Sequence, residues 1–130
     1  MFVIKRLNSF IYMRSGFSAR LDQFVRQGLM GGCVWGLRSA EGDWGVTRSH
    51  VKNVLEVMPF WANQYDAEKV CCEEWHVYSA TPIDLEEFLE DWLPGMHKDY
   101  MQVGINWCED LRGDEVAPLD LMELFVSKLD

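Results

Sequence analysis

Three stretches decide the fold: Val-Met-Pro-Phe-Trp at residues 57–61, Asp-Trp-Leu-Pro-Gly-Met-His at 91–97 and Val-Gly-Ile-Asn-Trp at 103–107. Each joins an apolar run to a proline, which restricts the backbone, or to a glycine, which frees it. Each stretch therefore predicts a corner of one compact fold whose apolar residues are buried. A chain of 130 residues has the length of one domain and can bury a core without metal or disulfide help.

Charge is distributed unevenly along the chain. Residues 1–52 carry eight basic and three acidic residues, a net charge of +5, whereas residues 53–130 carry four and eighteen, a net charge of −14. A solvated acidic surface explains this pattern, and so does a face that binds a basic partner protein. The overall charge of −9 argues against nucleic-acid binding, which depends on neutralising phosphates.

The four cysteines, Cys33, Cys71, Cys72 and Cys108, form no CxxC pair and no disulfide pattern. The N-terminal apolar run is short and has no signal-peptidase motif, and no stretch is long enough to cross a bilayer. These features predict a cytoplasmic protein with reduced thiols and no membrane contact. We expect neither a cofactor nor a metal.

Apolar spacing and turn residues predict the elements of the first half. A helix capped by Ser18 is expected over residues 18–30, followed by a hairpin of strands at 33–38 and 44–48. A third strand at 54–58 is expected to stop at Pro59. Asn63 is expected to cap a helix that continues to Trp75.

The second half contains the clearest local signal. Asp84 and Glu87 stand at the positions of a capping box, and Ile83 and Phe88 at those of a hydrophobic staple. We expect this helix to end at Pro94. A strand is then expected at 101–107, a turn at 111–114, and a final helix that begins at Pro118 and buries four apolar residues: Leu121, Leu124, Phe125 and Leu129.

Strands precede most helices in this arrangement, which predicts an α+β fold. The expected architecture is a small, mostly antiparallel sheet with an early β-meander, covered by three to four helices. Residues 1–16 are interpreted as an N-terminal extension, with Met13 as an alternative start, and residues 17–130 as a single domain.

From residue 34 onward the chain resembles a bacterial family known only as domain of unknown function 2750. The resemblance rests on the three stretches quoted above, together with Val-Trp-Gly-Leu-Arg at 34–38 and Asp-Leu-Arg-Gly-Asp-Glu-Val at 110–116. It implies a bacterial, cytoplasmic protein and brings no catalytic residues. One departure is that Asp99 is followed by Tyr100 where the family tends to have Asp-Gly, which puts the tight turn there in question.

Two groups of residues could carry chemistry. Glu68, Cys72 and His76 are spaced by four on the expected helix, so they could bind zinc or form a thiolate nucleophile. Three ligands on one straight helix would chelate a metal poorly and no fourth ligand is evident, so a polar helix flank is the simpler interpretation. His97, Asp99 and Asn106 could form a general-base site, with Trp107 beside them. The alternative is that Asp99 and Asn106 bond to turn backbone and His97 is exposed.

Trp61, Trp92 and Trp107 each stand at the end of an element, where indoles either line a binding groove or pack in the core. The acidic residues Glu86, Glu87, Glu90 and Asp91 are expected on the solvent side of their helix. Paired carboxylates can act as acid and base, but a solvated helix face is the simpler interpretation.

Two functions from different classes fit these observations. The first is a non-catalytic protein-binding or regulatory module, for example one with an immunity-like role, whose partner is another, basic protein or a second copy of itself. Its candidate binding residues are Trp61, Trp92, His97, Asp99, Asn106 and Trp107. The second is a small enzyme with its site around His97, Asp99, Asn106 and Trp107.

Overall fold

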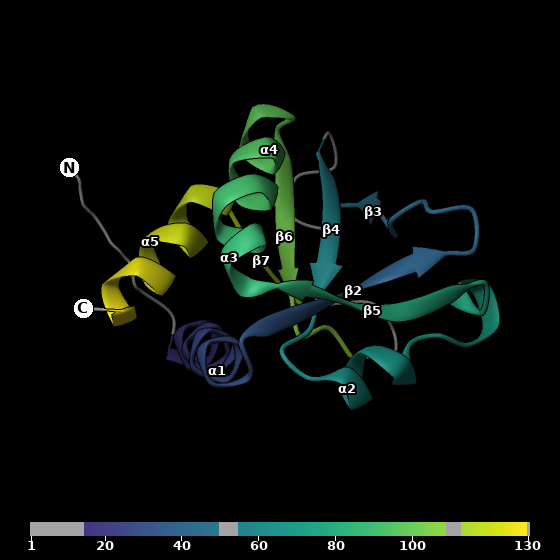
Figure 1. The fold of residues 1–130 in the computed structure, drawn as a ribbon, viewed down its shortest axis with the longest axis horizontal. Helices are drawn as coiled ribbons and strands as arrows, with labels where there is room; N and C mark the ends of the chain where they lie inside the picture. The colour runs from purple at the N-terminus through teal and green to yellow at the C-terminus, as the bar shows by residue number, and fades with distance from the viewer. Residues whose placement is uncertain (1–14, 50–54, 109–112, 130) are drawn as a thin grey trace.

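The computed structural model describes residues 15–49, 55–108 and 113–129, and it confirms the α+β fold (Figure 1). The hydrogen-bonded order of one sheet is β3-β4-β6-β7, and a second sheet pairs β2 with β5. The elements are α1 (Ser15–Gly31), β2 (Cys33–Ser39), β3 (Thr47–Arg48), β4 (Glu56–Phe60), α2 (Gln64–Lys69), the 3-10 helix η2 (Glu73–Trp75), β5 (Tyr78–Asp84), α3 (Leu85–Glu87), the π-helical η3 (Phe88–Trp92), α4 (Leu93–Lys98), β6 (Met101–Ile105), β7 (Asp114–Val116) and α5 (Pro118–Leu129).

The N-terminal helix starts earlier than predicted. Because α1 begins at Ser15, Ser18 lies inside the helix, and the last two residues of the expected 1–16 extension are helical. Residues 1–14, with the alternative start at Met13, lie outside the described residues, as do residues 111 and 112 of the expected turn. Among the described residues, no helix is both long and apolar enough to span a membrane.

The predicted hairpin partner of β2 was wrong. The turn after β2 forms, because Ser39 N donates to Asp43 O and Gly45 N donates to Leu37 O, but only an isolated bridge joins Arg38 to Trp44. β2 instead pairs with the distant β5 along its whole length. Its other edge bonds to the chain just after β4, where Trp35 and Trp61 exchange two backbone hydrogen bonds of 2.7 and 2.8 Å. With both edges of β2 bonded, the chain turns away after Trp44, so β2 and β3 form no ladder, and only the β3–β4 pairing of the expected early meander is present.

Pro59 lies inside β4 instead of ending it. Phe60 O accepts from Asn106 N, so the polar backbone groups of Phe60 face β6 and those of Pro59 face the opposite edge. On that edge, β3 pairs only with Glu56 and Val57. The missing N–H of Pro59 therefore removes no bond from the parallel β4–β6 ladder, and a proline is tolerated there.

The capped helix also runs past its predicted end. Asp84 caps the helix as predicted by accepting a hydrogen bond from Glu86 N, but the carboxylate of Glu87 accepts from Trp92 Nε1 instead of completing a capping box. Ile83 and Phe88 are both buried. The helix then widens into the π turn η3, where Leu93 N donates to Phe88 O. This wider turn accommodates Pro94, which has no N–H and would clash in a regular helix, so helical structure continues to Lys98.

The helix after Asn63 is shorter than predicted. Asn63 does cap α2 by accepting from Asp66 N, but α2 ends at Lys69. Cys72 is extended, and Glu73 has a left-handed φ of 47° before the separate η2 turn. The run predicted as one helix to Trp75 is therefore two short helices with a break between them.

The outer edge of β5 offers few free backbone groups. The backbone N–H and C=O groups of Trp35 and Leu37 point to the edge of β2 away from β5. Because the strands are antiparallel, the backbone groups of the residues opposite them, Pro82 and Ala80, point to the outer edge of β5. Pro82 has no N–H to donate, and the half-buried Cys71 lies next to Ala80, whose backbone lowers the pKa of the thiol. A proline and a neighbouring thiol thus interrupt the strand edge that a second chain could otherwise extend.

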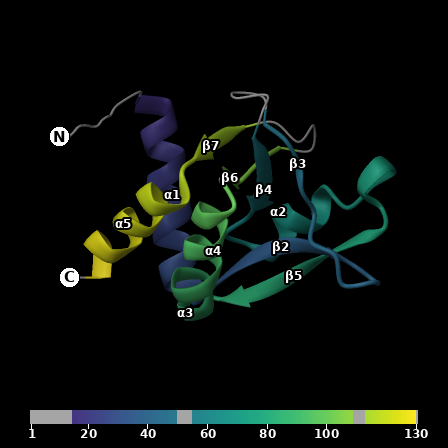
Figure 2. The same ribbon diagram turned by 90° about the horizontal axis from the view of Figure 1, so that it is seen from above.

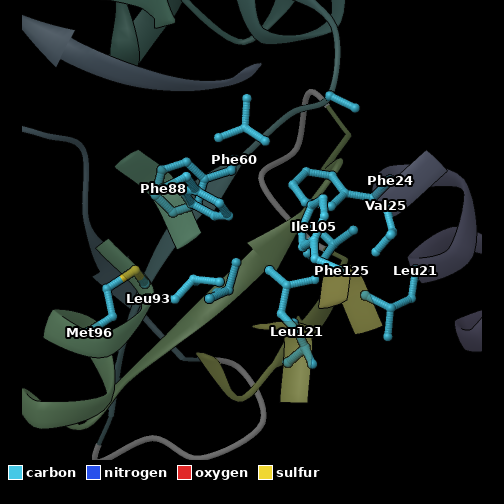
Figure 3. Close-up of a cluster of buried hydrophobic side chains, with 14 of the residues drawn as sticks. Leu21, Phe24, Val25, Phe60, Phe88, Leu93, Met96, Ile105, Leu121 and Phe125 are labelled. Carbon is cyan, nitrogen blue, oxygen red and sulfur yellow. The ribbon is translucent and has the colours of Figure 1, made fainter. Parts of the chain in front are cut away.

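The main core lies between the larger sheet and the helices α1, α4 and α5 (Figures 2 and 3). At its centre, Phe125 packs edge-on against Phe24 of α1 and Phe88 of η3. In α5, Leu121 and Phe125 are buried as predicted and Leu124 is partly buried, but Leu129 is 61% exposed because the helix extends beyond the core.

Candidate functional site

Two of the predicted tryptophans are tied together in the core. Trp61 is fully buried, and its indole Nε1 donates to Trp107 O at 2.8 Å. Trp107 is 2% exposed, and its own Nε1 donates to Asp114 O at 2.9 Å. The two bonds link the ends of β4 and β6 to the start of β7. Neither indole presents a surface to a ligand, so both serve the packing role that the sequence left open.

Asn106 holds the same end of the sheet. Its backbone has a left-handed φ of 47°, which asparagine tolerates better than most residues, and it turns the chain out of β6. Its N–H donates to Phe60 O, and its side-chain Oδ1 accepts from Ala62 N at 3.0 Å. Asn106 therefore bonds to backbone just after β4, as the simpler of the two interpretations predicted.

Glycines provide the room for Trp107. A Cβ on Gly104 would lie 2.7 Å from Trp107 Cε2, and one on Gly113 would lie 2.6 Å from its Cδ1. Such distances are shorter than van der Waals contact, so the indole fills the space next to both backbones. The spacing of glycine and tryptophan in this region is explained by close packing.

The other half of the predicted site lies at the opposite end of β6. His97 and Asp99 are exposed at the end of α4, just before β6 begins at Met101. The extended chain from Tyr100 to Asn106 covers about 20 Å. Consequently His97 and Asp99 do not meet Asn106 and Trp107, and the acid–base site proposed from these four residues does not assemble.

Sequence reasoning missed the position of Tyr100. Its φ is 57°, in the left-handed region that favours glycine, and the residue is 80% exposed. Asp99 N donates to Gly95 O and Tyr100 N to His97 O, so the tight turn that the missing glycine put in question does form. The signal was the tyrosine itself, standing directly after Asp99, the residue that caps the end of α4.

Trp92 is the one predicted tryptophan that reaches the surface. It packs edge-on against Trp44, with ring centroids 4.7 Å apart, and its Nε1 donates to Glu87 Oε2 at 3.2 Å. The guanidinium carbon of Arg38 lies 5.2 Å from the centroid of Trp44. A half-buried aromatic pair therefore lies beside both a cation and a carboxylate.

The acidic helix face is confirmed as a solvent-facing surface. Four carboxylates, those of Glu86, Glu87, Glu90 and Asp91, are exposed along α3 and η3. In the described part of the chain, Glu87 bonds to Trp92, but none of the four forms an ion pair. We call these four residues the acidic face.

The candidate metal ligands are not brought together. Glu68 accepts from Gln64, the Cys72 thiol donates to Lys69 O, and His76 Nδ1 lies 2.6 Å from Glu73 O. The break after α2 removes the regular spacing that would have aligned them. Within residues 15–49, 55–108 and 113–129, no cluster of three histidine, cysteine or acidic side chains is placed to hold a metal ion.

Among the described residues, three ionisable groups have shifted pKa values. Burial raises the pKa of Asp114, and Arg20 opposes the shift; Asp114 Oδ2 is buried and has no hydrogen-bond partner within the described chain. Hydrogen bonds from Arg26 and then Lys128 lower the pKa of Asp22, which joins α1 to α5. Burial also raises the pKa of the Cys71 thiol, against the bond from Ala80. These three groups are scattered and form no common site.

Comparison with known proteins gave one match. A family model described as "Protein of unknown function (DUF2750)" matches residues 21–125, which include every β-strand of the structure and most of α1 and α5. No curated protein and no solved structure matches the chain.

Proposed function

The chain belongs to the DUF2750 family, and from that premise we propose that it is a non-catalytic module of the bacterial cytoplasm that binds a basic partner protein. The acidic face supports this proposal. Four carboxylates along one helix, without ion-pair partners in the described chain, present a local negative charge that is available to an incoming cation.

The helix that carries the acidic face is firmly held. Asp84 caps its start, and Phe88 and Leu93 anchor it in the core with no exposed surface. A rigid element presents its charges in a defined arrangement, which lowers the entropy lost on binding. We therefore assign the acidic face the roles of guiding the partner's approach and setting its orientation.

The alternative enzyme gains no support from the geometry. Its proposed residues are divided between the two ends of β6, with His97 and Asp99 exposed at one end and Asn106 and Trp107 bonded to backbone at the other. A general base has to lie within hydrogen-bond reach of the group it serves. No observation favours a second function.

The proposal is tested by affinity capture with a charge-neutralised chain. The immobilised wild type should retain a basic protein at about 50 mM salt and release it at about 500 mM, because screening weakens contacts between exposed charges. A variant with E86Q, E87Q, E90Q and D91N should lose that protein.

The matched control neutralises four exposed carboxylates elsewhere: E41Q, D43N, E68Q and E74Q. It should retain the partner, since the net charge changes equally but the acidic face is intact. Equal loss with both variants would show that only overall charge matters, and it would overturn the assignment to this helix.

A further inference from the structure

A second surface of the molecule, on α5, has the spacing of a helix–helix contact. Leu119, Val126 and Leu129 are 43%, 49% and 61% exposed, and Met122 is partly exposed. Their separations of three, four and three residues place them on one stripe of the helix. We call Leu119, Met122, Val126 and Leu129 the α5 stripe.

The α5 stripe is separate from the face that α5 buries. At about 100° per residue, the buried Phe125 lies between Lys128 on one side and the stripe on the other. Lys128 faces α1, where its Nζ is 2.9 Å from Asp22, and the ring of Phe125 contacts that of Phe88. The stripe therefore lies on the flank of α5 that is turned away from α1 and toward the helix bearing the acidic face.

Figures 1 and 2 agree with this placement, since α5 lies next to α4 in both views, and residues of the two helices are in contact. The exposed Glu123 borders the stripe on its solvent side. An apolar stripe with carboxylates nearby complements a helix whose own apolar stripe is bordered by basic residues.

From these observations we propose that the α5 stripe is the apolar contact surface for a basic amphipathic helix of the partner. The inference rests on the proposed function and names the surface on which that partner docks. The partner's basic residues would face Glu123 and the acidic face, while its apolar residues would cover Leu119, Val126 and Leu129.

Charge and area both argue against a second copy of this chain as the occupant. Two copies each carry a net charge of −9 and repel one another, most strongly at low salt. Moreover, three half-exposed side chains on each copy bury far less than the roughly 1,000 Å² of a stable interface. A basic partner offsets the small apolar area with attraction between opposite charges.

The probe for this inference is a synthetic peptide of 18 residues in which leucines at helical spacing alternate with lysines. Its affinity for the wild type is compared by calorimetry with that for L119Q/V126Q, whose changes lie on the exposed side of α5. The variant should bind about tenfold or more weakly. The control Y65Q, at a 69% exposed tyrosine on α2, should bind like the wild type.

A second peptide with alanines in place of the leucines separates charge from apolar contact. The affinity of this alanine peptide should be lower than that of the leucine peptide, and it should be the same for the wild type and for L119Q/V126Q. Equal affinity of the leucine peptide for the wild type and L119Q/V126Q would overturn the role of the stripe. Loss of its binding in the variant that neutralises the acidic face would still support the proposed function.

Two further outcomes overturn a proposal. If neither peptide binds the wild type, attraction to a basic partner fails, and the proposed function fails with it. If wild-type chains associate in sedimentation experiments and L119Q/V126Q chains do not, the stripe is a contact between copies of this protein instead.

Discussion

The indole of Trp61 donates its hydrogen to the backbone carbonyl of Trp107 at 2.8 Å, inside the core and 46 positions away along the chain. Trp107 in turn donates to Asp114 O, so two indoles and two backbone carbonyls connect β4, β6 and β7. This relationship explains two of the three tryptophans at the corners of the fold: the rings of Trp61 and Trp107 fill core volume, and each also satisfies a backbone acceptor that would otherwise be buried unpaired.

Replacing Trp61 by phenylalanine should lower the free energy of unfolding by about 1–3 kcal/mol, because Trp107 O loses its donor in a buried setting. Equilibrium unfolding in urea provides the measurement. Trp35→Phe serves as the control, since the Trp35 indole makes no hydrogen bond within the described chain. If Trp61→Phe lowered the free energy of unfolding less than Trp35→Phe, the hydrogen bond from Trp61 to Trp107 O would not be important for stability.

A methyl group on Gly104 should destabilise the fold by about 1–3 kcal/mol, because it would overlap the Trp107 indole in a packed core. By contrast, Gly95→Ala should stabilise it by about 0.5–1 kcal/mol, since Gly95 is helical and a Cβ there meets no atom within 4 Å. The same urea titration compares the two variants. If Gly104→Ala and Gly95→Ala shifted the urea midpoint of unfolding by the same amount, the packing around Trp107 would be looser than described.

Tyr100→Gly should raise the free energy of unfolding by about 0.5–1 kcal/mol. The left-handed conformation costs a residue with a side chain about 1–2 kcal/mol, and the greater freedom of glycine in the unfolded chain offsets part of that gain. Thermal unfolding followed by circular dichroism measures the change. Ser79→Gly, at the second residue of β5, should lower the melting temperature, so a drop in both variants would argue against strain at Tyr100.

Asp114→Asn should stabilise the protein near neutral pH and have little effect in acid. Burial raises the pKa of Asp114 above its ordinary value of 3.8, so the folded state holds the proton more tightly than the unfolded state. The wild type therefore loses stability as pH rises from the unfolded-state pKa to the folded-state pKa, and the loss is constant above that window.

This prediction is checked by melting wild type and Asp114→Asn across pH 3 to 7, the range of about the ordinary carboxyl pKa and above. The difference in melting temperature should grow with pH. A difference that stays the same at every pH would show that the substitution acts through packing alone, and a difference that shrinks as pH rises would reverse the assigned direction of the shift.

Local signals in the sequence were reliable where one segment decides its own structure. The cap at Asp84, the burial of Ile83 and Phe88 and the start of α5 at Pro118 all follow from contacts within a few residues. The acidic face was found in the same way, because helical spacing alone separates it from the buried side.

Pairings between distant segments could not be predicted in this way. Whether β2 pairs with the next strand or with β5 depends on which distant segments occupy its two edges. In the folded protein β5 occupies one edge, and the backbone bonds between Trp35 and Trp61 occupy the other. Similarly, His97 and Asn106 are close in sequence, yet a straight strand between them holds them apart. Pro94 was misleading because a π turn allows a proline that a regular helix rejects.

The covered rim of β5 has a consequence for how this protein can associate. Fibrils begin to form when the exposed backbone N–H and C=O groups of one strand edge pair with those of another chain. In this protein Pro82 and the thiol of Cys71 interrupt that edge of β5. The native protein should therefore remain monomeric at high concentration, and alkylation of the Cys71 thiol with a bulky reagent should promote its aggregation.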